Sequence, residues 1–148
     1  MRKMILFAGL ITIGFLMSCG TTPNVHDDSV PLEKSATITF QATWTVKVFN
    51  EIAVQLKKSA MMGTEFTIPA GKSTFILDLD TGKMISHTRY IGKNISFSYD
   101  FEAGKEYSIW FWFTNDAGEI DGKGAPSLIV SPKGDNKKVI TSMKLKLN

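Results

Sequence analysis

Residues 37–48 read TITFQATWTVKV, and this stretch decides the fold class. Apolar and polar side chains alternate along it without a break, so an extended chain would place all the apolar ones on one face. Its polar face is rich in threonine, which has high β propensity. The apolar positions are Ile38, Phe40, Ala42, Trp44, Val46 and Val48, and the polar positions are Thr37, Thr39, Gln41, Thr43, Thr45 and Lys47. The pattern predicts one long strand with one buried face.

The alternation returns along the rest of the chain. After Asn50 and Glu51, the run Ile52–Leu56 favours a partner strand, although apolar spacing over Lys47–Ala60 is also compatible with a helix. The other predicted strands are Glu65–Ile68, Ser73–Leu79, Met84–Ile91 closed by Gly92, Ile95–Phe101, Tyr107–Phe113, Ser127–Ser131 and Val139–Leu147. The chain is therefore expected to be all-β.

Turn signals separate these strands. Pro69–Lys72 is predicted to be a hairpin connection, and Asp80–Lys83 and Glu102–Lys105 are predicted to be further turns, because proline presets φ and glycine tolerates positive φ. About 8–9 short strands, a turn about every ten residues and no long helix predict an antiparallel β-sandwich.

Composition limits the classes of protein to which the chain can belong. Its 148 residues are 43% hydrophobic and 21% charged, which fits one folded domain and excludes disordered and collagen-like chains. The formal charge of +3 includes Arg2 and Lys3, and Arg89 is the only later arginine. Because the remaining lysines are scattered, nucleic acid is excluded as a partner.

The first twenty residues, MRKMILFAGLITIGFLMSCG, have the order of parts of an export signal: two cations, an apolar run over Met4–Met17, and small residues. The apolar run is shorter than the roughly 20 residues that a spanning helix needs. Leu16–Cys19 resembles the lipobox of bacterial lipoproteins. The resemblance implies cleavage before Cys19, a thioether lipid on its sulfur and acylation of its amine. Cys19 is the only cysteine, so no internal disulfide can form.

These features predict the organisation of the chain. Residues 1–18 form the signal peptide, 19–35 a flexible tether with lipidated Cys19, and 36–148 the β-sandwich domain. The tether is polar and contains Pro23 and Pro31. His26, with the two aspartates that follow it, is interpreted as solvated tether and not as a metal site. The expected location is the bacterial cell envelope, with the membrane as a partner through Cys19, and the outer membrane or cell surface favoured over the inner membrane.

Two turn phrases, IPAGK at 68–72 and FEAGKEY at 101–107, resemble strand–turn–strand phrases of PEGA-like and transthyretin-like modules in bacterial surface lipoproteins. The resemblance covers about Val46 to Phe113. It implies a transthyretin-like or immunoglobulin-like sandwich and a binding or spacer unit. It transfers no catalytic residue.

Catalytic chemistry finds little support in the sequence. The two histidines are His26, in the tether, and His87, whose neighbours Ser86 and Thr88 would point to the opposite face of a strand. No nucleophile-elbow, zinc-protease, dithiol or nucleotide-binding glycine motif occurs. The chain is predicted to be no enzyme and to use no cofactor, and a hydrolase stays as a remote alternative.

Candidate binding residues lie in and after Tyr107–Phe113, which reads YSIWFWF. Trp110 and Trp112 share the face opposite Tyr107. If exposed, they lie about 7 Å apart and form a platform for sugar rings or a protein partner; the alternative is that a loop or neighbouring element covers them. Trp110, Trp112 and Tyr107 are the ligand-binding candidates.

The glycine-rich stretch Asn115–Pro126 offers a weaker calcium candidate, formed by Asp116, Glu119 and Asp121. EF-hand spacing is absent, and Lys123 lies among the carboxylates. The predicted function is therefore a lipid-anchored, non-enzymatic binding, adhesion or envelope-assembly module with a protein or carbohydrate ligand. The alternative is a carbohydrate-binding module that uses the tryptophan pair.

Overall fold

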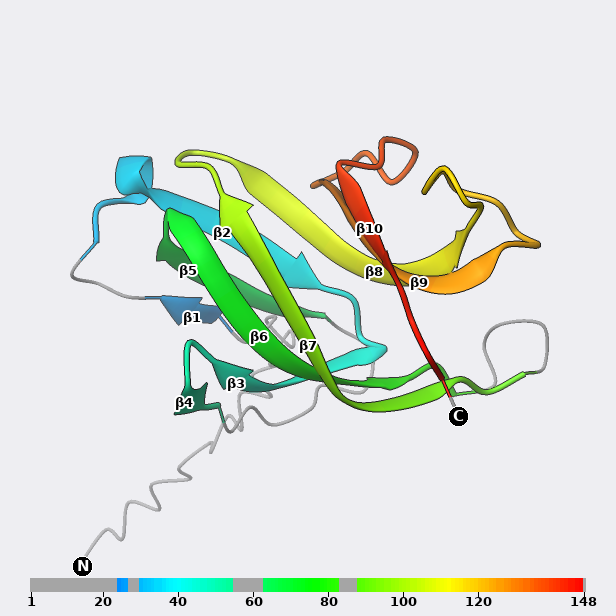
Figure 1. The fold of residues 1–148 in the computed structure, drawn as a ribbon. Coiled ribbons are helices and arrows are strands. Elements are labelled where there is room, and N and C mark those ends of the chain that lie inside the picture. The colour runs from blue at the N-terminus through cyan, green and yellow to red at the C-terminus, as the bar shows by residue number, and fades with distance from the viewer. Residues whose placement is uncertain (1–23, 27–29, 55–62, 83–87, 148) are drawn as a thin grey trace, which may run out of the picture.

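The computed structural model describes residues 24–26, 30–54, 63–82 and 88–147. In these ranges the chain is all-β and forms two sheets packed on each other (Figure 1). The strands are β1 (Asn24–His26), β2 (Ser35–Phe40), β3 (Trp44–Phe49), β4 (Ile52–Ala53), β5 (Thr64–Pro69), β6 (Gly71–Asp80), β7 (Ile91–Phe101), β8 (Glu106–Thr114), β9 (Ala125–Pro132) and β10 (Thr141–Lys144). A 3-10 turn, η1 (Leu32–Lys34), precedes β2.

Sheet A has the strand order β1-β5-β2-β8-β9-β10, and sheet B has the order β4-β3-β6-β7. All pairings are antiparallel except β1 with β5 and β2 with β8, which are parallel. The predicted all-β sandwich is confirmed, as a mostly antiparallel one.

The single strand predicted over Thr37–Val48 is wrong, because the stretch divides between the sheets. β2 belongs to sheet A and β3 to sheet B, and Gln41–Thr43 form the corner between them. The Gln41 carbonyl accepts a hydrogen bond from the Trp44 N–H at 2.9 Å and closes this corner. A chain that crosses between two sheets keeps the same side chains inward, so alternation alone cannot separate one strand from two.

The hairpin predicted at Pro69–Lys72 is also wrong. β5 lies in sheet A and β6 in sheet B, and only Ala70 separates them. Gly71 has a φ of 116°, which glycine adopts without strain. The turn at Glu102–Lys105 is confirmed, and it too connects the sheets, from β7 to β8. Turn residues specify a reversal of the chain, but not the sheet that the next strand joins.

Other boundaries differ in detail. Gly92 does not close a strand but lies inside β7, and residues 84–87 of the predicted strand Met84–Ile91 lie outside the described residues. The last strand is β10 alone, shorter than Val139–Leu147. β4 confirms the start of the partner strand predicted after Asn50, and residues 55–62 lie outside the described ranges.

Two short elements occupy the stretch interpreted as a tether. β1 pairs with β5, and η1 lies directly before β2. Three residues are too few to show a periodic pattern, so the sequence carries no signal for either element. Cys19 and the whole leader lie outside the described residues.

Aromatic rings from both sheets form the centre of the core. The Phe75 ring of β6 lies 5.0 Å from Phe40 and 6.0 Å from Phe66, both of sheet A. Phe101 and Tyr107, 5.1 Å apart, extend the cluster along the junction of β7 and β8. All five side chains are at most 3% exposed. The aromatic cluster joins the two sheets.

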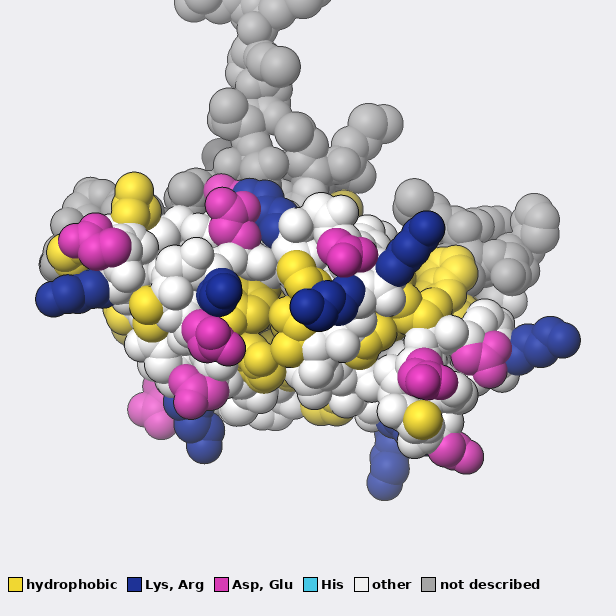
Figure 2. Space-filling view, turned by 90° about the horizontal axis from the view of Figure 1, so that it is seen from above, with side chains coloured by type: hydrophobic (Ala, Val, Ile, Leu, Met, Phe, Trp, Pro, Cys, Tyr) yellow, Lys and Arg dark blue, Asp and Glu magenta, His cyan; other side chains and the backbone are white. Residues whose placement is uncertain are grey.

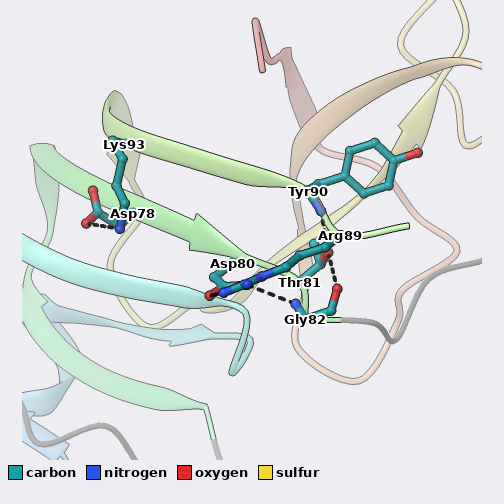
Figure 3. A network of polar contacts seen from close by, with 7 residues as sticks. All are labelled: Asp78, Asp80, Thr81, Gly82, Arg89, Tyr90 and Lys93. Atoms are coloured by element: carbon teal, nitrogen blue, oxygen red, sulfur yellow. Dashed lines mark hydrogen bonds and ion pairs between the residues drawn. The ribbon is translucent and has the colours of Figure 1, made fainter. Parts of the chain in front are cut away.

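A polar network ties the end of β6 to the start of β7 (Figure 3). Asp80 accepts two hydrogen bonds from the Arg89 guanidinium, at 2.9 and 2.7 Å. Thr81 Oγ1 accepts the Tyr90 N–H at 2.9 Å, and the Thr81 N–H donates to the Tyr90 carbonyl at 3.1 Å. The Tyr90 ring lies 5.4 Å from Phe111. The network therefore holds Tyr90 against sheet A.

Asp78 lies on the outer face of sheet B beside this network (Figure 3). Partial burial raises the pKa of Asp78, but hydrogen bonds from the Asn94 N–H and Lys93, with the charges of Lys93 and Lys47, outweigh it and leave the pKa below its usual value. A lowered native pKa gives stability that is present above the unfolded-state pKa and lost as pH falls through the native value.

We expect Asp78→Asn to destabilise the domain by less than about 1 kcal/mol at neutral pH, because the ion pairs are partly exposed. The difference from wild type should disappear well below about pH 4, where the native carboxyl is protonated. Urea unfolding at neutral and acidic pH measures both effects, with Asp100→Asn on the next strand as the control. A difference that persists undiminished in acid would contradict the assignment.

Candidate binding surfaces

The outer face of sheet A carries the two tryptophans predicted to bind a ligand. Trp110 pairs with Ile129 and Trp112 with Ser127, so all four side chains point away from the core. Ile129 and Ser127 are nevertheless fully buried. Loop 115–124 approaches this face, because Ser142, which pairs with Ile129, donates from Oγ to the Gly118 carbonyl at 3.3 Å. This face of the sheet is therefore partly covered.

Both tryptophans are half-buried, between the two alternatives that the sequence left open. Trp110 donates from Nε1 to Ser131 Oγ at 3.1 Å. It borders a shallow hollow of about 190 Å³, which we call the indole hollow and which Thr39, Gln41, Ser108, Ile109 and Asn136 also line. Trp112 does not line it.

Gln41 lines the indole hollow with an amide whose Nε2 has no hydrogen-bond acceptor among the described residues. Its Oε1 accepts the Phe111 N–H at 3.2 Å, which leaves Nε2 to donate. Tyr107, the third ligand-binding candidate, lies on the opposite face of β8 and is 3% exposed. Its hydroxyl accepts the Glu102 N–H at 3.1 Å. The structure does not bring Tyr107 together with the tryptophans.

The three calcium candidates have separate partners. Asp116 lies 2.5 Å from Lys144 Nζ, and this hydrogen bond and charge lower the pKa of Asp116. Glu119 accepts Asn115 Nδ2 at 3.0 Å, and Asp121 accepts the Lys123 N–H at 3.1 Å. Among the residues that the structure describes, no three His, Cys, Asp or Glu side chains are grouped to hold a metal ion.

Loop 115–124 instead forms one wall of a groove. We call the space of about 800 Å³ between residues 116–120 and residues 137–144 the loop groove. The wall is anchored at its base, where the Asp121 N–H donates to the Phe113 carbonyl at 2.9 Å. Ile120 and Ile140 line opposite sides and are 37% and 39% exposed. Lys137, also in the lining, forms no ion pair with a described residue.

A second groove, the edge groove, lies beside β7 and has a volume of about 480 Å³. Tyr99, Tyr107, Pro132 and Ile140 form its apolar lining, and Glu102, Lys105, Glu106 and Lys138 form its charged lining. Figure 2 views this end of the sandwich from above and shows apolar side chains exposed between lysines and acidic residues. The two grooves share Ile140.

The charges around the edge groove are not all paired. Lys133 lies 2.9 Å from Glu65 and 3.2 Å from Glu106, and its hydrogen bond to Glu65, with Glu106, raises the pKa of Lys133 against the opposing effect of burial. Lys105 and Lys138 form no ion pair with any residue in the described ranges. Burial, Tyr107 and nearby carboxylates raise the pKa of Tyr99, which keeps its hydroxyl protonated at neutral pH. Within the described part of the chain, the edge groove therefore has two lysines and Glu102 that form no ion pair, next to apolar surface.

Sequence reasoning missed both grooves. Ile120 is one apolar residue in a glycine-rich loop, and Ile140 lies in a stretch predicted to be a strand with Val139 and Thr141 facing inward. The only feature of the sequence that points to the grooves is an isoleucine at a loop position, where residues are usually polar. The grooves form only because loops distant in sequence meet at one end of the sandwich.

No protein-family model matches the chain, and neither the curated proteins nor the solved structures gave a match. Within the described part of the chain, no helix has the length and apolar character needed to cross a membrane.

Proposed function

We propose that the chain is an exported, lipid-anchored, non-enzymatic binding module that holds a protein partner at the bacterial envelope. The lipobox resemblance at Leu16–Cys19 supports the anchor, and the lone cysteine fits modification at that position. More than one acyl chain on Cys19 would make the attachment stable, since a single chain binds a membrane only marginally. The likeness of the turn phrases to surface-lipoprotein modules supports a binding or assembly role.

The loop groove is the observation that carries the binding role. Ile120 and Ile140, both more than a third exposed, line it together with Lys137, which forms no ion pair with a described residue. Apolar side chains left exposed around a concave polar surface are typical of sites that bind another protein. The folded loop wall gives the groove a defined shape before a partner arrives, which lowers the entropic cost of binding.

Carbohydrate binding is a second candidate, supported by the indole hollow. Trp110 offers an aromatic surface beside the Gln41 and Asn136 amides and the hydroxyls of Thr39 and Ser108. Rings next to amides and hydroxyls suit a sugar, whose faces are apolar and whose edges form hydrogen bonds. In this case envelope polysaccharide should protect wild-type fluorescence from iodide and should not protect Trp110→Phe. Equal protection of both proteins would exclude the hollow.

The protein-binding proposal is tested by capture from native envelopes with Ile120→Ser, and with Ile91→Ser as the matched control. Ile91 is 39% exposed, a fraction similar to the 37% of Ile120, but it does not line the loop groove. We expect Ile120→Ser to lower recovery of cross-linked partner at least about tenfold, as at an interface hot spot, and Ile91→Ser to leave it unchanged. Equal recovery with the two variants would contradict the proposal.

The lipid anchor is tested by a separate experiment. Mass spectrometry of the mature protein should find an acylated N-terminal Cys19, and Cys19→Ala should move the protein out of the membrane fraction. An unmodified Cys19 would contradict the anchor without affecting the capture experiment.

A further inference from the structure

β7 presents an unpaired backbone edge. It is the last strand of sheet B, is 11 residues long, and among the described strands pairs only with β6. The Asn50 N–H donates to the Thr74 carbonyl at 2.9 Å, so the backbone groups of Thr74 point toward β3. Those of its neighbours Ser73 and Phe75 therefore point toward β7, where they face Tyr99 and Phe97.

The alternation of these hydrogen bonds determines which backbone N–H and C=O groups of β7 do not bond to β6. Because Phe97 and Tyr99 bond to β6, the backbone N–H and C=O groups of Ser96, Ser98 and Asp100 point away from it. None of these groups forms a backbone hydrogen bond on that side within the described residues. The second half of β7 thus has a row of free donors and acceptors.

Only the first half of this edge is protected. Asn94 interrupts regular strand geometry with a φ of 52°, and Lys93 pairs with Asp78 at 3.2 Å. Leu147 packs beside Gly92, where an added Cβ would lie 3.0 Å from its Cδ2. Proteins normally block an edge strand with such charges, irregularities or covering segments. The edge from Ser96 to Phe101 has only the charge of Asp100.

The unprotected half lies along the edge groove. In Figure 1, β7 and the segment from β10 to the C-terminus converge near the end marked C and diverge toward the loop after β9. At the wide end, Tyr99 of β7 and Pro132 of β9 both line the groove, together with Tyr107 and Ile140. Sheet A therefore continues past the edge of sheet B and offers apolar surface to a strand placed next to β7.

From this geometry we infer that the edge of β7 from Ser96 to Phe101 accepts one extended segment of a partner protein, which adds to sheet B as a fifth strand. The backbone groups of Ser96, Ser98 and Asp100 bind the segment, and its inward side chains cover Tyr99, Pro132 and Ile140. The site extends over roughly 20 Å at about 3.4 Å per residue. The site shares Ile140 with the loop groove but does not include Ile120.

Charge and space define the occupant. Lys105 and Lys138 line the edge groove, form no ion pair with a described residue, and favour an acidic residue near one end of the segment. A second copy of the chain does not fit along the whole of β7, because the end of its own β7 strand would have to enter the narrow end. That end is already filled by Leu145, 8% exposed, and by Leu147.

The test uses a fluorescent synthetic peptide of about seven residues, with alternating valine and threonine and a glutamate at each end. Binding to the purified chain is followed by anisotropy. Two further peptides carry N-methyl groups on either all the valine or all the threonine amides. Because only alternate amides of an added strand face β7, one methylated peptide should lose at least about tenfold in affinity and the other should bind like the parent. Equal loss from both, or no binding of the parent at about 1 mM, would overturn the inference.

Variants of the chain give a second measurement. Ser98→Pro removes an edge-facing N–H and should abolish peptide binding, whereas Ser98→Thr keeps that N–H and should bind normally. If Ser98→Pro does not fold, hydrogen exchange on the wild-type chain tests the inference instead. The bound peptide must protect the backbone amides of Ser96, Ser98 and Asp100 from exchange. Protection of the same amides by dimerisation without peptide would overturn the inference. Ile120→Ser should leave peptide binding unchanged, which distinguishes failure of this site from failure of the loop groove.

Discussion

Phe75→Ala is expected to destabilise the domain by about 3–5 kcal/mol. The Phe75 ring is fully buried and lies 5.0 Å from Phe40, 5.1 Å from Phe49 and 6.2 Å from Phe101. Its removal deletes apolar surface and leaves a cavity that the surrounding rings fill only in part. Edge-to-face contacts between the two sheets are lost as well.

Chemical denaturation measures this effect. Because a domain of this size has a total stability of about 5–15 kcal/mol, the variant should unfold at a much lower denaturant concentration. Ile52→Ala is the control: Ile52 is 68% exposed on β4 and should change stability by less than about 0.5 kcal/mol. A loss below about 1 kcal/mol for Phe75→Ala would mean that the aromatic cluster does not join the sheets as described.

The second large effect is expected from Gly124→Ala, at the end of the loop that walls the loop groove. A Cβ at this position would lie 2.1 Å from the Thr114 carbonyl oxygen and 2.4 Å from its carbonyl carbon. These are backbone atoms of β8, so no side-chain rotation relieves the overlap. The loop must move away from the strand, at a cost of about 1–3 kcal/mol or more.

Gly122→Ala in the same loop is the matched control, because a Cβ there meets no atom within 4 Å. We expect Gly124→Ala to lower the melting temperature by at least about 5 °C and Gly122→Ala to leave it nearly unchanged. Partner capture through the loop groove should weaken in the first variant alone. Similar melting temperatures for the two variants would show that the loop does not approach Thr114 as described.

Alternation predicted most inward residues correctly, but neither Val48 nor the sheet to which each residue belongs. The register of β3 against β6 shifts between Val46 and Val48, so Phe49 and not Val48 packs against the core beside Phe75. Ile38, Phe40, Trp44 and Val46 are all buried, as the pattern in Thr37–Val48 indicates. The division of this stretch into β2 and β3, and the crossing at Ala70, had no sequence signal. Alternation with a period of two residues shows which side of a strand faces the core. It does not show the sheet, because both sheets of a sandwich share that core.

The candidate surfaces were predictable only in part. The pattern of Tyr107–Phe113 correctly placed Trp110 and Trp112 on the face opposite Tyr107. It could not predict that Ser131 binds Trp110 or that loop 115–124 covers Ile129, because both depend on segments distant along the chain. The grooves around Ile140 arise in the same way from segments that converge in space.

The order of residues alone therefore defines the fold class, most inward side chains and the turn at Glu102–Lys105, because strand geometry and backbone preferences are local. The proposed export and lipid anchor also rest on local sequence alone, through the lipobox resemblance at Leu16–Cys19. Sheet membership, the unpaired edge at Ser98 and both grooves follow from the pairing of distant strands. Such pairing depends on which arrangement of the strands buries the most apolar surface while every buried backbone group forms a hydrogen bond. A short stretch of sequence cannot determine this, because the arrangement involves the whole chain.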